Sequence, residues 1–119
     1  MKRKLNDSEQ RILELLWDRG PLPAGQLARL LGEQVGWSKT TTYTLLGRCV
    51  DKGILERRDP GFLCSPLVTR REVQAAETQA LIDKMYGGAA DRLVASLLEQ
   101  RALSPEEIAR LKQLVAELK

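Results

Sequence analysis

Residues 34–53 read QVGWSKTTTYTLLGRCVDKG, and this stretch decides the fold. Ser38 is a favourable N-cap and Gly53 a favourable C-terminal stop, so we expect a helix between them. At about 100° per residue, the apolar side chains gather on one side, with Thr42 near them: Leu45, Leu46, Cys49 and Val50. The other side then presents Lys39, Thr40, Thr41, Tyr43, Thr44 and Arg48. Because residues 34–50 contain no carboxylate, this outward face carries hydroxyls and cations without acidic groups.

Two further helices are expected before this segment. Asn6, with Glu9 three residues later, forms a capping-box pattern that predicts a helix over residues 7–19. A second helix is expected over residues 23–32, where leucines recur at three- and four-residue spacing until Gly32.

A hairpin is expected after the helices. The turn-forming sequence Asp59-Pro60-Gly61 separates the runs 54–58 and 61–66, which we predict to pair as two antiparallel strands. Three helices followed by a hairpin is the order of a winged helix-turn-helix. We therefore expect a mainly α fold with a small β-hairpin wing, in a domain over residues 1–68.

The C-terminal part, residues 69–119, is predicted to be helical throughout. Gly87-Gly88 interrupts the pattern, a helix is expected over about 89–100, and Ser104-Pro105 opens a last one. The apolar residues along this last helix form a stripe too short to hold a coiled coil alone. We therefore expect the C-terminal helices either to fold back on the first domain or to meet the same helices of another chain. The residues assigned to a dimerisation face are Leu93, Leu97, Ile108, Leu111, Val115 and Leu118.

Composition excludes several classes of function. The 119 residues include no histidine, which removes the usual general base and the commonest metal ligand. Cys49 and Cys64 alone cannot complete a zinc site, so we predict no catalytic residues, no metal and no cofactor. No segment is long and apolar enough to span a membrane, and no secretory signal is evident, so a cytoplasmic protein without membrane association is the simplest expectation.

The net charge is too small to indicate a nucleic-acid partner by itself, since it could serve solubility, but its distribution along the chain is uneven. Residues 1–68 hold 11 Lys+Arg and 8 Asp+Glu, whereas residues 69–119 hold 8 of each, so the net +3 lies entirely in the first part. Hydroxyls and cations bond phosphate oxygens, threonine methyls contact thymine methyls, and arginine reads guanine. We therefore predict that the outward face of residues 39–52 binds double-stranded DNA, although a simple solvated face is the alternative. Arg57 and Arg58 in the hairpin are predicted phosphate contacts, or else residues that keep an edge strand soluble.

Order and spacing also resemble a known family. Trp17, the pair Trp37-Ser38, Lys52-Gly53 and the stretch 103–108 are similar to the penicillinase and methicillin-resistance repressors, the BlaI/MecI type. The resemblance implies a homodimeric bacterial repressor whose winged helix binds a palindromic operator and whose C-terminal helices dimerise. It places Thr41, Thr44 and Arg48 at DNA-facing positions. This chain departs from the pattern at Lys39, where the family usually has proline, and at Thr40, where it usually has lysine.

Other hypotheses remain open at this point. The chain could instead be a winged-helix interaction module that recruits a partner protein through its C-terminal helices. If it is a repressor, its release could follow ligand binding, a redox change at Cys49 and Cys64, or proteolysis at Ser96-Leu97, where the resemblance places the cleaved bond. Ser96 and Leu97 are more simply ordinary helix residues. Both cysteines are more simply small buried hydrophobic residues. The chain ends without the cysteine-rich tail of copper-responsive relatives.

Overall fold

The computed structural model describes residues 5–118 and divides them into two compact units. The first runs as far as Glu77, and the second begins at Thr78. The division of function between residues 1–68 and 69–119 stays a prediction.

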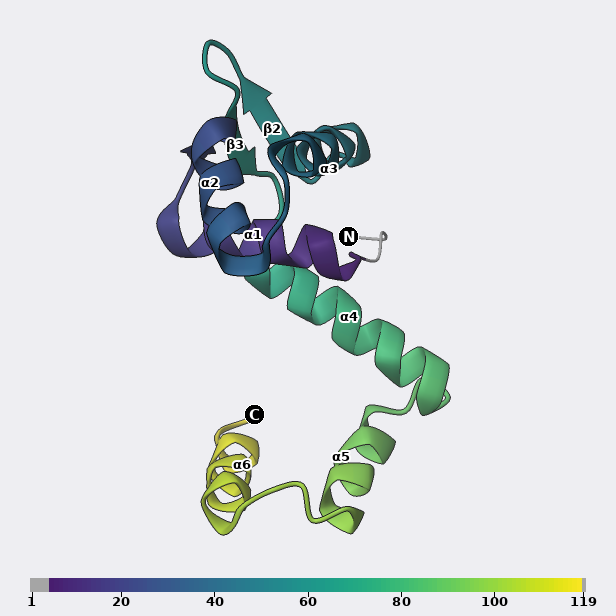
Figure 1. Cartoon of the computed structure of the whole chain (residues 1–119). Helices are drawn as coiled ribbons and strands as arrows, with labels where there is room; N and C mark the ends of the chain where they lie inside the picture. Colours follow the sequence, from purple (N-terminus) through teal and green to yellow (C-terminus); the bar gives the residue numbers. More distant parts are fainter. Residues whose placement is uncertain (1–4, 119) are drawn as a thin grey trace. The chain divides into compact units, whose positions relative to one another are not determined.

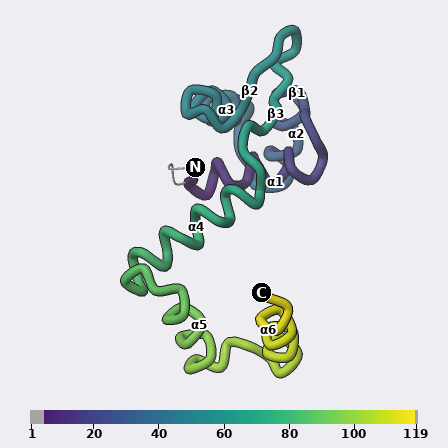
Figure 2. Tube along the Cα trace, turned by 180° about the vertical axis from the view of Figure 1, so that it is seen from behind, coloured from purple at the N-terminus to yellow at the C-terminus, as the bar shows by residue number. Residues whose placement is uncertain are grey.

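The first unit has the predicted mainly α architecture with a small sheet (Figure 1). Its elements, in chain order, are α1 (Asp7–Arg19), β1 (Leu22–Pro23), α2 (Ala24–Val35), α3 (Lys39–Lys52), β2 (Leu55–Arg58) and β3 (Leu63–Pro66). The three strands are antiparallel in the order β1-β3-β2, so β3 lies between the other two (Figure 2). The predicted fold class, a winged helix followed by C-terminal helices, is confirmed.

Caps fix the ends of the helices. At the start of α1, the Glu9 N–H donates to Asn6 Oδ1 at 2.9 Å and the Asn6 N–H donates to Glu9 Oε1 at 3.0 Å, the predicted capping box. The predicted end of the second helix at Gly32 is wrong, because α2 continues for one more turn to Gly36. Gly36 has φ +73°, a left-handed conformation that glycine adopts without steric cost, and this residue ends the helix.

All three helices and the hairpin contribute to one hydrophobic core in the first unit. Of the four α3 side chains expected to point inward, Leu46 and Cys49 are fully buried, whereas Leu45 and Val50 pack partly buried at the margin. Thr42 is fully buried, as predicted, and its hydroxyl donates to the Ser38 carbonyl at 3.1 Å. The other fully buried large side chains are Ile12, Leu13, Leu16, Leu27, Leu31, Leu55 and Cys64.

The second unit consists of helices alone. Helix α4 (Arg70–Met85) begins in the first unit and ends in the second, and it is followed by α5 (Ala90–Glu99) and α6 (Pro105–Glu117). The predicted cap of the last helix is present, since the Glu107 N–H donates to Ser104 Oγ at 3.1 Å. No residue of α5 or α6 is buried. These two amphipathic helices therefore leave much of their apolar surface uncovered within a single chain.

Candidate nucleic-acid interface

The outward face of α3 has the predicted composition. Lys39, Thr40, Thr41, Thr44 and Arg48 are exposed. Tyr43 is half-buried rather than exposed, because its ring packs against Phe62 of the hairpin. A shallow groove of about 480 Å³ lies along this face, lined by Lys39, Thr40, Tyr43 and Thr44.

The N-terminus of α3 organises one of these hydroxyls. Ser38 Oγ accepts a hydrogen bond from the Thr41 N–H at 3.1 Å and donates to Thr41 Oγ1 at 2.9 Å. The Thr41 hydroxyl therefore accepts a bond inside the protein and keeps its own proton for an outside acceptor. Together with the positive end of the helix dipole, this favours an anion at the start of α3.

The two cations on the outward face of α3, Lys39 and Arg48, are available for a partner. Among residues 5–118, no carboxylate lies within ion-pair distance of Lys39 or Arg48. Lys39 Nζ instead lies 5.9 Å from the centre of the Tyr43 ring, a cation–π arrangement that leaves its charge uncompensated. The face therefore presents positive charge and hydroxyl donors together, as phosphate binding requires.

The two wing arginines, predicted as a pair, occupy different environments. Arg57 Nε donates to Asp59 Oδ1 at 3.2 Å, and Arg57 Cζ lies 3.8 Å from the centre of the Phe62 ring. Arg58 instead forms a short-range ion pair with Glu56 on its own strand. Sequence reasoning missed Phe62, whose role depends on contacts between the hairpin and α3 that no local pattern reveals.

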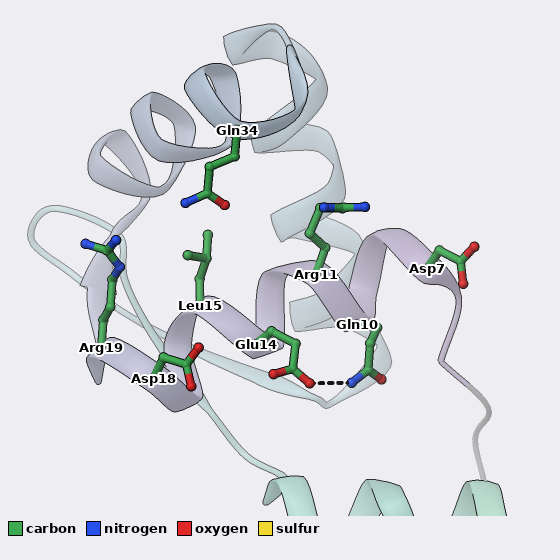
Figure 3. A pocket seen from close by; sticks show the side chains of 8 residues that line it. All are labelled: Asp7, Gln10, Arg11, Glu14, Leu15, Asp18, Arg19 and Gln34. Atoms are coloured by element: carbon green, nitrogen blue, oxygen red, sulfur yellow. Dashed lines mark hydrogen bonds between the residues drawn. The ribbon is translucent and has the colours of Figure 1, made fainter. Parts of the chain in front are cut away.

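A second hollow in the first unit is polar and lies away from α3. It measures about 620 Å³ and is formed by α1 and the end of α2, with acidic and basic side chains interspersed around it (Figure 3). Gln10 Nε2 donates to Glu14 Oε1 at 2.9 Å across its floor. Arg70, at the start of α4, donates to both Glu14 (2.7 Å) and Asp18 (2.8 Å), so these carboxylates already have a cationic partner.

The predicted dimerisation residues are only partly brought together. Ile108, Leu111 and Val115 line an apolar hollow of about 330 Å³ between α5 and α6. From α5, however, Val94 and Leu98 line it rather than the predicted Leu93 and Leu97, which are half-buried. Leu118 is 76% exposed, just beyond the end of α6. The remaining lining residues are Leu103 and Lys112.

The two cysteines are buried and free, which fits their expected role as small hydrophobic residues. Burial raises the pKa of the Cys49 thiol from an ordinary 9.0 to about 12 and that of Cys64 to about 11. A thiol held protonated is a poor nucleophile and a poor metal ligand. In the part of the chain that the structure describes, no cluster of three potential metal-ligating side chains occurs. None of the helices from residue 5 to 118 has the length and apolarity needed to cross a bilayer.

The bond between Ser96 and Leu97 lies within helix α5. Ser96 Oγ accepts hydrogen bonds from Tyr86 Oη at 3.2 Å and from Gln100 Nε2 at 2.8 Å. The Tyr86 bond connects the middle of α5 with the residue that follows α4, whereas the Gln100 bond stays within α5 and its C-cap. Both residues are helical, as the simpler interpretation expects, and proteolysis at this bond stays an untested hypothesis that would require local unfolding of α5, because proteases bind extended segments.

Comparison with known proteins decides the family. The model of the family described as Penicillinase repressor matches residues 5–117, nearly the entire chain. The chain belongs to the penicillinase repressor family. This confirms the resemblance seen in the sequence, and it makes the chain a member of a family of transcriptional repressors rather than of enzymes.

Individual relatives agree with the family assignment. The chain is 25% identical to the penicillinase repressor of Bacillus licheniformis over 118 residues, which cover 98% of this chain and 92% of that protein. It is also 25% identical to the methicillin resistance regulatory protein MecI of Staphylococcus aureus (strain N315), over 94% of this chain and 93% of the relative. An uncharacterized 16.5 kDa protein of Latilactobacillus sakei is 31% identical over 114 residues, 94% of this chain and 78% of that protein.

Proposed function

We propose that this member of the penicillinase repressor family is a dimeric repressor that binds a palindromic operator in duplex DNA through α3 and the hairpin. The observation that carries the proposal is the exposed face of α3, where uncompensated Lys39 and Arg48 accompany the hydroxyls of Thr40, Thr41 and Thr44. A helix presented in this way fits the major groove, which admits one α-helix.

Affinity and specificity have different sources in this proposal. Lys39, the Thr41 hydroxyl and the N-terminus of α3 bind backbone phosphates, which fix the position of the helix on the duplex. Thr44 lies about one turn and Arg48 about two turns beyond Thr41 on the same face, where they discriminate bases by a thymine-methyl contact and a guanine contact, respectively.

Dimerisation is supported by the uncovered apolar surface of the second unit. Leu98 is 50% exposed, Val115 61% and Leu118 76%, and the apolar hollow between α5 and α6 is open to a partner. Burying a leucine or valine side chain contributes about 1.5–3 kcal/mol, so a few such residues per chain favour self-association. A twofold-symmetric dimer then requires a twofold-symmetric operator.

The experiment is selection of duplexes by the full-length chain from a random-sequence pool, followed by sizing of the complex and titration with salt. We expect an enriched palindrome bound by two chains, with the logarithm of the binding constant falling linearly with the logarithm of salt concentration. Recovery of no enriched sequence, or a single chain on an asymmetric site, would contradict the proposal.

The second candidate function is a protein-interaction module. The observation that favours it is the same open apolar hollow between α5 and α6, which could receive a partner's helix as well as a second copy. Apolar association depends weakly on salt, whereas phosphate binding depends strongly on it. A monomer that selects no DNA but binds a partner in a salt-insensitive way would favour this second function.

A further inference from the structure

Arg57 and Arg58 are neighbours on β2 and so lie on opposite faces of the wing, and strand pairing determines which face each takes. In the antiparallel pair of β2 and β3, Arg57 is opposite Cys64, and Arg58 is opposite Leu63. Residues directly opposite each other point to the same face of a sheet. Because the Cys64 side chain is fully buried, Arg57 lies on the face turned toward the helices, and Arg58 lies on the other face with Glu56.

Phe62 joins Arg57 to α3. The guanidinium carbon of Arg57 is 3.8 Å from the centre of the Phe62 ring, and the Tyr43 ring meets Phe62 edge-on at 5.9 Å and 81°. On the side of α3, Lys39 Nζ lies 5.9 Å from the centre of the same Tyr43 ring. A continuous row of side chains therefore runs from the first turn of α3 to the wing: Lys39, Tyr43, Phe62 and Arg57.

The backbone of Phe62 is also fixed by contacts inside the protein. Phe62 has φ +50°, in the left-handed region that is unfavourable for a bulky side chain. Its carbonyl accepts the N–H of Ala24, the first residue of α2, at 3.0 Å. Such a conformation persists where surrounding contacts determine it, and it is concentrated at functional sites.

Arg57 keeps most of its donors for an outside group. Its Nε–H is bonded to Asp59 at 3.2 Å, which leaves the four N–H groups of the terminal nitrogens. Stacking on Phe62 fixes the plane of the guanidinium, and the side chain remains 47% exposed. A fixed, exposed guanidinium beside a cationic helix face is suited to a phosphate oxygen.

We propose that Phe62 is a positioning residue, which holds Arg57 in line with Tyr43 and Lys39 so that Arg57, and not Arg58, is the phosphate contact of the wing. This inference rests on the proposed DNA-binding function and refines the earlier expectation that both arginines make this contact. Phe62 acts through Arg57 and does not itself contact DNA.

The test measures binding of five variants, four single and one double, to the duplex that the wild-type chain selects, over a range of salt concentrations. Arg57→Ala should weaken binding about tenfold and lower the slope of the salt dependence by about one, as loss of one phosphate contact predicts. Arg58→Ala, the matched control on the opposite face, should change affinity by less than about twofold and leave the slope unchanged. Both arginines are exposed, so neither substitution disturbs the core.

The positioning role of Phe62 is tested by two conservative substitutions. Phe62→Leu keeps bulk but removes the aromatic face, and it should lower affinity and the salt slope as Arg57→Ala does. Phe62→Tyr keeps the face and should bind like the wild type. The double variant Phe62→Leu with Arg57→Ala should be no weaker than Arg57→Ala alone, because both changes remove the same contact.

Two results would overturn the inference: an unchanged salt slope in Arg57→Ala, or equal effects of Arg57→Ala and Arg58→Ala. Additive losses in the Phe62 and Arg57 double variant would also overturn the positioning role. If the wild-type chain selects no duplex at all, the proposed function fails instead, so the two failures are distinguishable.

Discussion

Lys52 Nζ lies 2.7 Å from Glu9 Oε1, and this ion pair joins the last turn of α3 to the first turn of α1. The Glu9 side chain is only 7% exposed, and the same oxygen accepts the Asn6 N–H that begins α1. One buried carboxylate therefore both caps one helix and ties it to the C-terminal end of the proposed DNA-binding helix.

Replacing Glu9 by glutamine should lower the free energy of unfolding. Glutamine can still accept the Asn6 N–H, but it loses the charge-assisted bond to Lys52, which contributes about 1–3 kcal/mol. Urea unfolding at pH 7 measures the change. Glu33→Gln, at an exposed position of α2, is the control and should change stability by less than about 0.5 kcal/mol. Equal effects of the two substitutions would show that the ion pair contributes no net stability.

Replacing Arg48 by alanine should reduce discrimination between bases. Arg48 is exposed on the face of α3 that we propose to enter the major groove. Loss of a base contact should cost about 1–3 kcal/mol on the selected duplex and much less on a scrambled duplex of equal length. Fluorescence anisotropy on both duplexes measures this difference. Equal losses on the two duplexes would reassign Arg48 to phosphate binding, and unchanged binding would remove it from the interface.

Replacing Gly47 by alanine should raise the stability of the protein but lower its affinity for DNA. A Cβ built at Gly47 meets nothing within 4 Å, so no contact inside the described chain requires a glycine in the middle of α3. Alanine should therefore raise the free energy of unfolding by about 0.5–1 kcal/mol.

The helical position of Gly47 lies on the outward side of α3, between those of Tyr43 and Thr44. Added bulk there should weaken binding to the selected duplex, and Gly47→Leu should weaken it more than Gly47→Ala, although both residues favour the helix. Thermal unfolding and anisotropy give the two readouts. Affinity that rises together with stability would contradict close approach of DNA at this residue.

Replacing Val115 by aspartate should prevent self-association without unfolding the chain. Val115 is 61% exposed and lines the apolar hollow between α5 and α6, so a carboxylate there is hydrated in the monomer and desolvated in the dimer. We expect the dimer dissociation constant to rise at least about tenfold, measured by sedimentation. Gln113→Asp, at an exposed position of α6 outside the hollow, is the matched control. A Val115→Asp variant that remains dimeric would place the dimer interface elsewhere.

The thiols of Cys49 and Cys64 should be unreactive in the folded protein. Burial raises the pKa of both, to about 12 and about 11, so iodoacetamide at pH 8 should modify them only after unfolding. A thiol that reacts rapidly in the native protein would reopen the redox hypothesis.

The same shifts predict a loss of stability at high pH. Well below pH 9 both thiols are protonated in the folded and the unfolded chain, and their contribution is complete. Above pH 9 the unfolded chain loses these protons while the folded chain retains them, so the free energy of unfolding should fall as pH rises toward 11. The difference between the wild type and a Cys49→Ala variant in urea unfolding at pH 8 and pH 10.5 isolates the effect of Cys49.

Sequence patterns predicted the bounds of those helices whose ends are marked by capping residues. The bounds of α1 and α3 agree with prediction because Asn6, Ser38 and Gly53 act locally on the backbone within one turn. Gly32 misled the prediction of α2, because an interior glycine costs only about 1 kcal/mol and packing of the helix overcomes it. Strand β1, two residues long, exists through pairing with β3 some forty positions away, and no local pattern indicates it.

The candidate site was predictable in composition but not in arrangement. The helical period places the hydroxyls and cations of α3 outward without any knowledge of the tertiary structure. Neighbours on a strand always point to opposite faces, but which of Arg57 and Arg58 faces the helices depends on the register between β2 and β3, and one residue of slip would exchange them. The role of Phe62 depends on contacts with Tyr43 and Arg57 together, so only the folded chain reveals it.

The absence of buried residues in α5 and α6 has a consequence for how strongly repression depends on the concentration of the chain. If two chains must cover these helices before an operator is bound, then below the dimer dissociation constant the abundance of bound dimer grows with the square of the chain concentration. A twofold fall in protein level then reduces the dimer about fourfold. In a repressor that works as we propose, a partial fall in protein level therefore lowers operator occupancy more than in proportion, without any ligand at the outward face of α3.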